Sequence, residues 1–166
     1  MYHTINEFLR DWKYEADATL GMFNALTDAS LAQRVSPEGR DIRMLAWHIV
    51  TSLPEMTKRV GLGIEGVGEH DAAPDSAAVI AQVYATAATS LREQLLQTWT
   101  DETLATEHDM YGEMWSNAKT LSVLLVHQIH HRAQLTVLMR QAGLRVPGIY
   151  GPAREEWEAM GMPAQP

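Results

Sequence analysis

The sequence predicts an all-α protein folded as a four-helix bundle with a short C-terminal helix. Four long stretches repeat apolar residues at steps of three and four, which is the period of one helix face. No stretch alternates apolar and polar residues as a half-buried strand does. A chain of 166 residues is of ordinary size for one domain with one core. We therefore assign residues 1–166 to a single domain.

The first two helices are marked by their caps and by a proline. Residues 4–7 (TINE) match a capping box, in which Thr and Glu each bind the other's backbone amide, so a helix is expected over residues 5–27. Residues 36–39 (SPEG) are typical of a turn. A second helix is expected from Asp41 to Pro54, because proline lacks the amide proton that continues a helix and should end or kink it.

The remaining helices follow a glycine-rich stretch. Residues 61–74 contain four glycines among acidic and polar residues and predict a long loop. A third helix is expected over residues 75–98, with its first residue, an aspartate, as the cap. Ser116 or Asn117 can begin the fourth helix, and Gly143 can end it, because glycine readily adopts the left-handed conformation that follows many helices.

The C-terminal part predicts a last short helix that begins at Pro152, where a missing amide proton costs nothing in the first turn. This helix carries Glu155, Glu156 and Trp157. The paired acids are typical of first-turn residues that face solvent and the helix dipole.

The composition excludes several classes of protein. Without cysteine there can be no disulfide and no thiolate ligand, so any metal must bind His, Asp or Glu. A net charge of −8 and scattered Lys and Arg argue against a nucleic-acid partner. No apolar run approaches the roughly 20 residues of a membrane span, and the N-terminus does not resemble a signal peptide. A cytoplasmic location is expected, without a membrane partner.

Three histidines are expected to point into the bundle. Viewed along the axis of the fourth helix, the side chain of His131 points the same way as several leucines. The His127 side chain is only about 40° away from that of His131 around the axis. His130 falls about 100° away, at the edge of the apolar stripe. In the second helix, His48 lies on the same side as Leu45.

Two interpretations of these inward histidines remain open from the residues alone. A shared cation would satisfy adjacent imidazoles on an apolar face, while their other ring nitrogens bind neighbouring groups. A polar network of buried hydrogen bonds would satisfy them as well. The other histidines are weaker candidates, with His70 and His108 possible outer groups of a site and His3 expected at the surface. Residues 127–131 (HQIHH) depart from the zinc-peptidase motif H-E-x-x-H, because Gln128 replaces the ionisable base.

Three segments point to a known family. Residues 127–135 (HQIHHRAQL) closely resemble the H-x-x-x-H-R-x-Q helix of the DinB-like proteins, with Ala133 where that family usually has glycine. Residues 45–49 (LAWHI) resemble the family's first-histidine segment, and residues 146–152 (VPGIYGP) resemble its tail.

This resemblance covers nearly the whole chain and implies both a fold and a metal site. The fold would be an up-down-down-up four-helix bundle. One divalent transition metal would be held by His48, His127 and His131. Zinc, nickel or iron could serve, because sets of imidazoles accept all three and availability decides among them.

The resemblance also implies a reaction class. Characterised relatives resemble thiol S-transferases and thiol-dependent isomerases, so the substrate would be a small molecule and the sulfur would come from a low-molecular-weight thiol. A metal on neutral imidazoles lowers the pKa of a bound thiol or water. One alternative is a metal-dependent hydrolase that uses metal-bound water, with Glu155 or Glu156 as the base. Another is a metal-binding helical-bundle dimer without catalytic activity.

Residues beside the expected ligands are candidates for supporting roles. Arg132 is expected to pair with a carboxylate from a neighbouring helix or from the C-terminal segment. Gln134 and His130 could hydrogen-bond a loop or orient a ligand. Trp47 adjoins His48, although a tryptophan here is more typical of packing.

A homodimer is the last expectation. Trp12, Trp47 and Trp99 lie on helix stripes that a bundle of this size need not cover, and exposed apolar patches mark interfaces.

Overall fold

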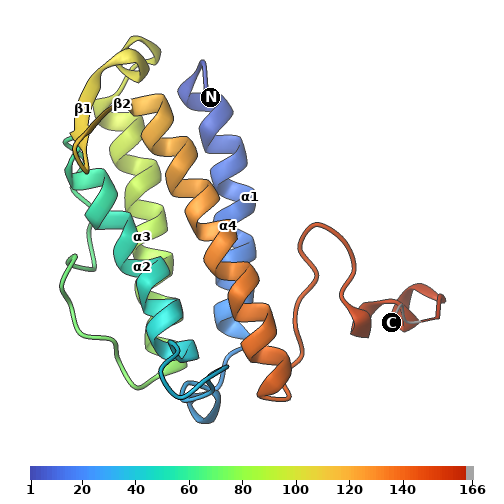
Figure 1. The fold of residues 1–166 in the computed structure, drawn as a ribbon. Helices are drawn as coiled ribbons and strands as arrows, with labels where there is room; N and C mark the ends of the chain where they lie inside the picture. The colour runs from blue at the N-terminus through green and yellow to red at the C-terminus, as the bar shows by residue number, and fades with distance from the viewer. Residues whose placement is uncertain (164–166) are drawn as a thin grey trace.

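The structure is a computed structural model that describes residues 1–163, so the last three residues of the expected domain lie outside it. Four long helices form a bundle, as the sequence predicted (Figure 1). They are α1 (Ile5–Asn24), α2 (Ile42–Lys58), α3 (Ala77–Thr98) and α4 (Asn117–Gln141). Within residues 1–163 no helix is long and apolar enough to cross a bilayer.

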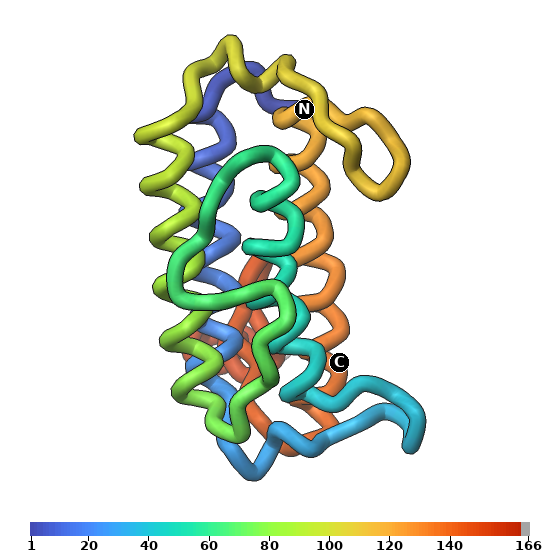
Figure 2. Tube along the Cα trace, turned by 90° about the vertical axis from the view of Figure 1, so that its left-hand side faces the viewer, coloured from blue at the N-terminus to red at the C-terminus, as the bar shows by residue number. Residues whose placement is uncertain are grey.

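The helix order around the bundle follows from which helices touch. α2 packs against α3 and α4, and α1 packs against the same two helices. α1 and α4 run in one direction while α2 and α3 run in the other, which is the up-down-down-up arrangement (Figure 1). α2 and α3 are neighbours that run in the same direction, so residues 59–76 must run back along the length of the bundle from the end of α2 to the start of α3. In Figure 2 this connection passes in front of the helices.

The caps expected from the sequence are present for three helices. Thr4 Oγ1 accepts a hydrogen bond from the Glu7 amide, and Glu7 Oε2 accepts from the Thr4 amide, both at 3.1 Å. Asp41 caps α2 and Ser116 caps α4. After α4, Gly143 adopts a left-handed φ of 73°, as predicted.

Two helix ends and one cap differ from expectation. α1 ends at Asn24 because Thr27 caps a separate 3-10 turn, η1 (Asp28–Ser30). Pro54 does not end α2, since it lies buried within a helix that continues to Lys58. Proline removes one helix hydrogen bond, and core packing on both sides of Pro54 outweighs that loss. Asp75 pairs with an arginine of α2 instead of capping α3.

A β-hairpin joins α3 to α4, so the prediction of no strands was wrong. The 3-10 turn η2 (Asp101–Ala105) leads into the antiparallel strands β1 (Glu107–Met110) and β2 (Glu113–Ser116). Tyr111 and Gly112 both have positive φ, as a tight two-residue hairpin turn requires. The strands escaped prediction because they are four residues long and show no apolar alternation.

The expected short C-terminal helix takes the form of two 3-10 turns, η3 (Arg154–Glu156) and η4 (Glu158–Met160). The chain leaves α4, runs back beside the bundle and then turns outward (Figure 1).

Candidate metal centre

His48 of α2 faces His127 and His131 of α4 across the contact between these two helices. The Nε2 atoms of His48 and His127 lie 3.2 Å apart, and those of His131 and His127 lie 3.1 Å apart. One nitrogen from each ring lies within 4.8 Å of the others. The three histidines thus form one group that could hold a metal ion.

Helix geometry explains why these three side chains meet. His127 and His131 are one turn apart, so they project from the same side of α4. The buried Leu124 and Leu135 stand one turn before and after them and anchor that side of α4 in the core. On α2, Leu45 and Ser52 are buried on either side of His48 in the same way.

The spacing of the ring nitrogens is compatible with a shared metal ion. In a tetrahedral zinc site with Zn–N bonds of about 2.0–2.1 Å, two nitrogens lie roughly 3.3–3.4 Å apart. The two Nε2 separations, 3.1 and 3.2 Å, are close to that value. His127 Nδ1 is buried and has no hydrogen-bond partner among residues 1–163, whereas both a polar core network and a metal site normally pair this nitrogen.

Electrostatics keeps these imidazoles neutral. Burial lowers the pKa of His48 and of His127 to about 4, and the neighbouring His131 contributes to both shifts. Burial also lowers the pKa of His131. At neutral pH the rings therefore carry lone pairs, the form that binds a metal.

Gln134 and His130 lie on the solvent side of the cluster. His131 Nδ1 is 2.8 Å from Gln134 Oε1, and Gln134 Nε2 is 3.1 Å from His130 Nε2. Both Gln134 and His130 are exposed. His130 is outside the three-histidine group, consistent with its expected place at the edge of the stripe.

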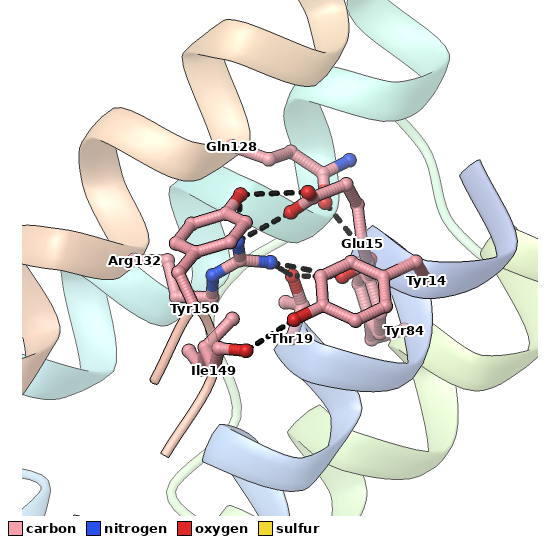
Figure 3. Close-up of polar contacts among 8 residues, drawn as sticks. All are labelled: Tyr14, Glu15, Thr19, Tyr84, Gln128, Arg132, Ile149 and Tyr150. Atoms are coloured by element: carbon pink, nitrogen blue, oxygen red, sulfur yellow. Dashed lines mark hydrogen bonds and ion pairs between the residues drawn. The ribbon is translucent and has the colours of Figure 1, made fainter. Parts of the chain in front are cut away.

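Arg132 points into a buried polar cluster (Figure 3). The residue is 1% exposed, and its guanidinium pairs with the Glu15 carboxylate of α1, as expected from the sequence. The same guanidinium donates to Thr19 Oγ1 at 3.1 Å and to the Tyr150 hydroxyl at 3.0 Å. Tyr150 in turn donates to Glu15 Oε1 at 2.6 Å. The cluster joins α1, α4 and the C-terminal segment.

The acids proposed as bases are engaged in the C-terminal segment. Glu155 pairs with Arg140. Glu156 accepts hydrogen bonds from the amides of Gly148 at 3.1 Å and Ala153 at 2.9 Å. Within residues 1–163 no hydrogen bond or ion pair joins either acid to a histidine.

The other candidate residues have separate roles. Trp47 is buried, and its indole donates to the Asp71 carbonyl at 2.6 Å, which ties the long loop to α2. His3 and His70 are exposed, and His108 lies in β1. None of these three belongs to the metal-binding group found in the described part of the chain.

An apolar groove beside His127 was not anticipated from the sequence. It has a volume of about 490 Å³ and is lined by α4 residues alone, namely Lys119, Ser122, Val123, Val126, His127 and His130. Val126 is 62% exposed. The only sequence signal for the groove was a valine outside the buried stripe.

Comparisons with known proteins agree with this architecture. The DinB family model matches residues 1–165. The uncharacterized protein YrdA of Bacillus subtilis (strain 168) is 42% identical over 164 residues, which cover 99% of this chain and 98% of that protein. A crystal structure of a DinB-like protein from Bacillus cereus ATCC 10987 is 45% identical and superposes with a TM-score of 0.87, over 90% of this chain and 100% of that one.

A second solved structure shares the fold. The DinB-like protein YjoA from Bacillus subtilis is 18% identical and has a TM-score of 0.67, with 88% of this chain and 98% of that one covered.

Proposed function

Because the chain belongs to the DinB family, we propose that His48, His127 and His131 hold one divalent transition metal in a thiol S-transferase or thiol-dependent isomerase. The observation that carries this proposal is the convergence of three neutral imidazoles, with Nε2 separations of 3.1 and 3.2 Å, at the surface between α2 and α4. All three rings are half-buried, so a ligand from solvent can reach the cluster.

Two features of the chain favour a thiol as the substrate, namely its three neutral imidazoles and its lack of cysteine. A divalent metal on three neutral imidazoles keeps its full charge and lowers the pKa of a thiol beside it. The chain has no cysteine, so the sulfur must come from outside. In the transferase reaction the thiol would lose its proton, a carbon–sulfur bond would form, and the leaving group would depart with the electron pair of the broken bond.

The groove on α4 supports a small-molecule substrate with an apolar part. It is a shallow, open depression of about 490 Å³ along one side of α4, and its lining is mostly apolar. It reaches His127 at one end, so a molecule lying along Val123 and Val126 would have its reactive end near the cluster. A hydrolase would need a base at the site, and Glu155 and Glu156 are engaged elsewhere.

Metal analysis after dialysis tests the site. Wild-type protein should retain about one equivalent of metal, while His48→Ala, His127→Ala and His131→Ala should each lose it. His130→Ala should still retain stoichiometric metal, because His130 adjoins the cluster without being one of its three ligands. His3→Ala, an exposed histidine outside the cluster, is the control. Wild-type stoichiometry in all three ligand variants would refute the metal site.

Cobalt substitution tests the reaction. Titrating the Co²⁺ protein with cellular thiols should give a saturable sulfur-to-metal charge-transfer band. The same thiols should then be consumed with an epoxide or a haloaromatic electrophile. A band without turnover would favour a metal-binding module without catalytic activity, and cleavage of activated esters without any band would favour a hydrolase.

We also propose a homodimer, on a different surface from the one the tryptophans suggested. Trp12 and Trp47 are buried, 2% and 9% exposed, and Trp99 is partly buried against the core, so the three tryptophans do not form an exposed patch. Beyond the groove, the outer side of α4 instead exposes Val137, and the helix contains no acidic residue although the chain carries a net charge of −8. An apolar surface without like-charge repulsion suits a second copy of the chain. Light scattering should give twice the 18.5 kDa of one chain.

A further inference from the structure

We infer that Gln134 is a positioning residue that holds His131 in the tautomer able to bind metal, and that His130 holds the Gln134 amide in the required orientation. This inference rests on the proposed metal function. Its basis is a chain of two hydrogen bonds, His131 Nδ1 to Gln134 Oε1 at 2.8 Å and Gln134 Nε2 to His130 Nε2 at 3.1 Å.

The positions of the protons in these two hydrogen bonds follow from the amide oxygen of Gln134. Gln134 Oε1 can only accept a hydrogen bond, so His131 Nδ1 carries the proton, and Nε2, which faces His127, carries the lone pair. A protonated Nδ1 needs an acceptor, and the amide oxygen of Gln134 is the group in reach. An imidazole whose second nitrogen donates to an oxygen is also more electron-rich, which strengthens its bond to a metal.

His130 matters because the side-chain amide of Gln134 can adopt two orientations, with either its oxygen or its nitrogen towards His131. A flipped Gln134 would present its NH₂ group to the Nδ1 proton of His131, and two donors would meet. With Oε1 on His131, the NH₂ group of Gln134 faces His130 Nε2, which accepts when the His130 proton is on Nδ1. With its proton on Nδ1, His130 therefore favours the amide orientation that suits His131.

A purely structural role for Gln134 has little support. The side chain is exposed, and both of its hydrogen bonds stay within α4, spanning three and four residues. It joins no second element, so its removal should leave the bundle intact. His127 provides the internal contrast, because its buried Nδ1 has no partner in the described part of the chain.

The experiment measures Co²⁺ affinity by competition with a chelator, in full-length protein, for Gln134→Leu, Gln134→Glu and His130→Ala. Loss of a partner that orients a metal-binding histidine weakens metal binding about 10- to 100-fold, so Gln134→Leu should fall in that range. Gln134→Glu keeps an acceptor and should bind at least as tightly as wild type. His130→Ala should weaken binding less than Gln134→Leu, because Gln134 keeps one of its two partners. Gln141→Leu, an exposed glutamine at the end of the same helix, is the matched control.

A spectroscopic measurement separates positioning from folding. In metal-free protein, nitrogen NMR of His131 should report a proton on Nδ1 in wild type and a shift towards the Nε2–H tautomer in Gln134→Leu, while the thermal unfolding midpoint stays unchanged. Wild-type affinity and an unchanged tautomer in Gln134→Leu would overturn the role of Gln134, as would a failure of Gln134→Glu to restore binding. An unchanged His130→Ala would overturn the role of His130. Full retention of metal by His131→Ala would instead remove the proposed function itself.

Discussion

Consecutive residues of α4 belong to two polar clusters of opposite kinds. Arg132 points to the α1 side, where Glu15, Thr19 and Tyr150 bind its guanidinium (Figure 3). His131 points to the α2 side, where its Nε2 meets another imidazole nitrogen instead of a group of opposite charge. The guanidinium of Arg132 has hydrogen-bond acceptors and an opposite charge within the protein. The histidine cluster instead brings the lone pairs of ring nitrogens together.

This difference separates a structural cluster from a binding site. A buried charge with a full set of partners locks elements together, and removing one partner is costly because the other stays buried. Neutral donors gathered at 3.1–3.2 Å gain little from one another and much from a cation. Substitutions in the first cluster should therefore reduce stability without metal, and those in the second should reduce only what metal adds.

The largest expected effect is that of breaking the buried ion pair. Arg132→Met should lower the free energy of unfolding of the metal-free protein by about 3–5 kcal/mol, because the Glu15 carboxylate remains buried without its partner. Denaturant unfolding measures it. The double variant Glu15→Leu with Arg132→Met should be more stable than Arg132→Met alone, and a double variant that is less stable would show that the carboxylate is not the cause.

Metal should stabilise the protein through the histidine cluster alone. At a free metal concentration 100 times the dissociation constant, the free energy of unfolding should rise by about 2.7 kcal/mol. His131→Ala should abolish this gain and leave the metal-free protein near wild-type stability. Thermal unfolding with and without a chelator provides the comparison, and an equal gain in both proteins would place the metal elsewhere.

Low pH should reduce the free energy of unfolding through the histidine cluster specifically. The pKa values of His48 and His127 are lowered from 6.5 in the unfolded chain to about 4 in the fold, so the unfolded state binds more protons between these values. The free energy of unfolding is therefore unaffected by these rings above pH 6.5 and falls as the pH drops towards 4, because protonation then favours the unfolded chain. Unfolding measured from pH 7 to 4 should show this loss in wild type and a smaller one in the variant with both histidines replaced by alanine. Bound metal should be released over the same range.

The smallest expected effect concerns the C-terminal segment. Tyr150→Phe removes the hydroxyl that binds both Glu15 and Arg132, at a cost of about 1 kcal/mol in the free energy of unfolding. Metal affinity should stay unchanged, because Tyr150 lies on the α1 side of α4. A fall in metal affinity in this variant would mean that the two clusters are coupled through α4.

Local patterns in the sequence were sufficient for the bundle and for the choice among histidines. Helix periodicity, the capping box at residues 4–7 and Gly143 depend on neighbours within a few residues, and such signals are independent of tertiary contacts. The four-residue step from His127 to His131 selects one helix side in the same way, which is why His130 could be set apart in advance.

The hairpin, the course of α2 through Pro54 and the partners of Arg132 had no such local signal. Strands of four residues without alternation carry too little information, and Tyr111 is held by a glutamate of α2 that is 56 residues away in sequence. Pro54 stays helical because its surroundings are buried. Only packing decides such cases.

The sequence by itself determined the four helices and the shared side of His127 and His131, because both follow from the fixed rotation of about 100° per residue in a helix. It did not determine which residues are most deeply buried, since the three histidines expected to point inward are half-buried while Gln128 and Arg132 are 0% and 1% exposed. Only the tertiary structure decided which inward residues meet. The contact of α2 with α4 places His48 against His127 and His131, and the contact of α1 with α4 provides Glu15 for Arg132. Helix period fixes a direction within one helix, whereas a binding site needs a distance between helices, and that distance is set by how the whole core packs.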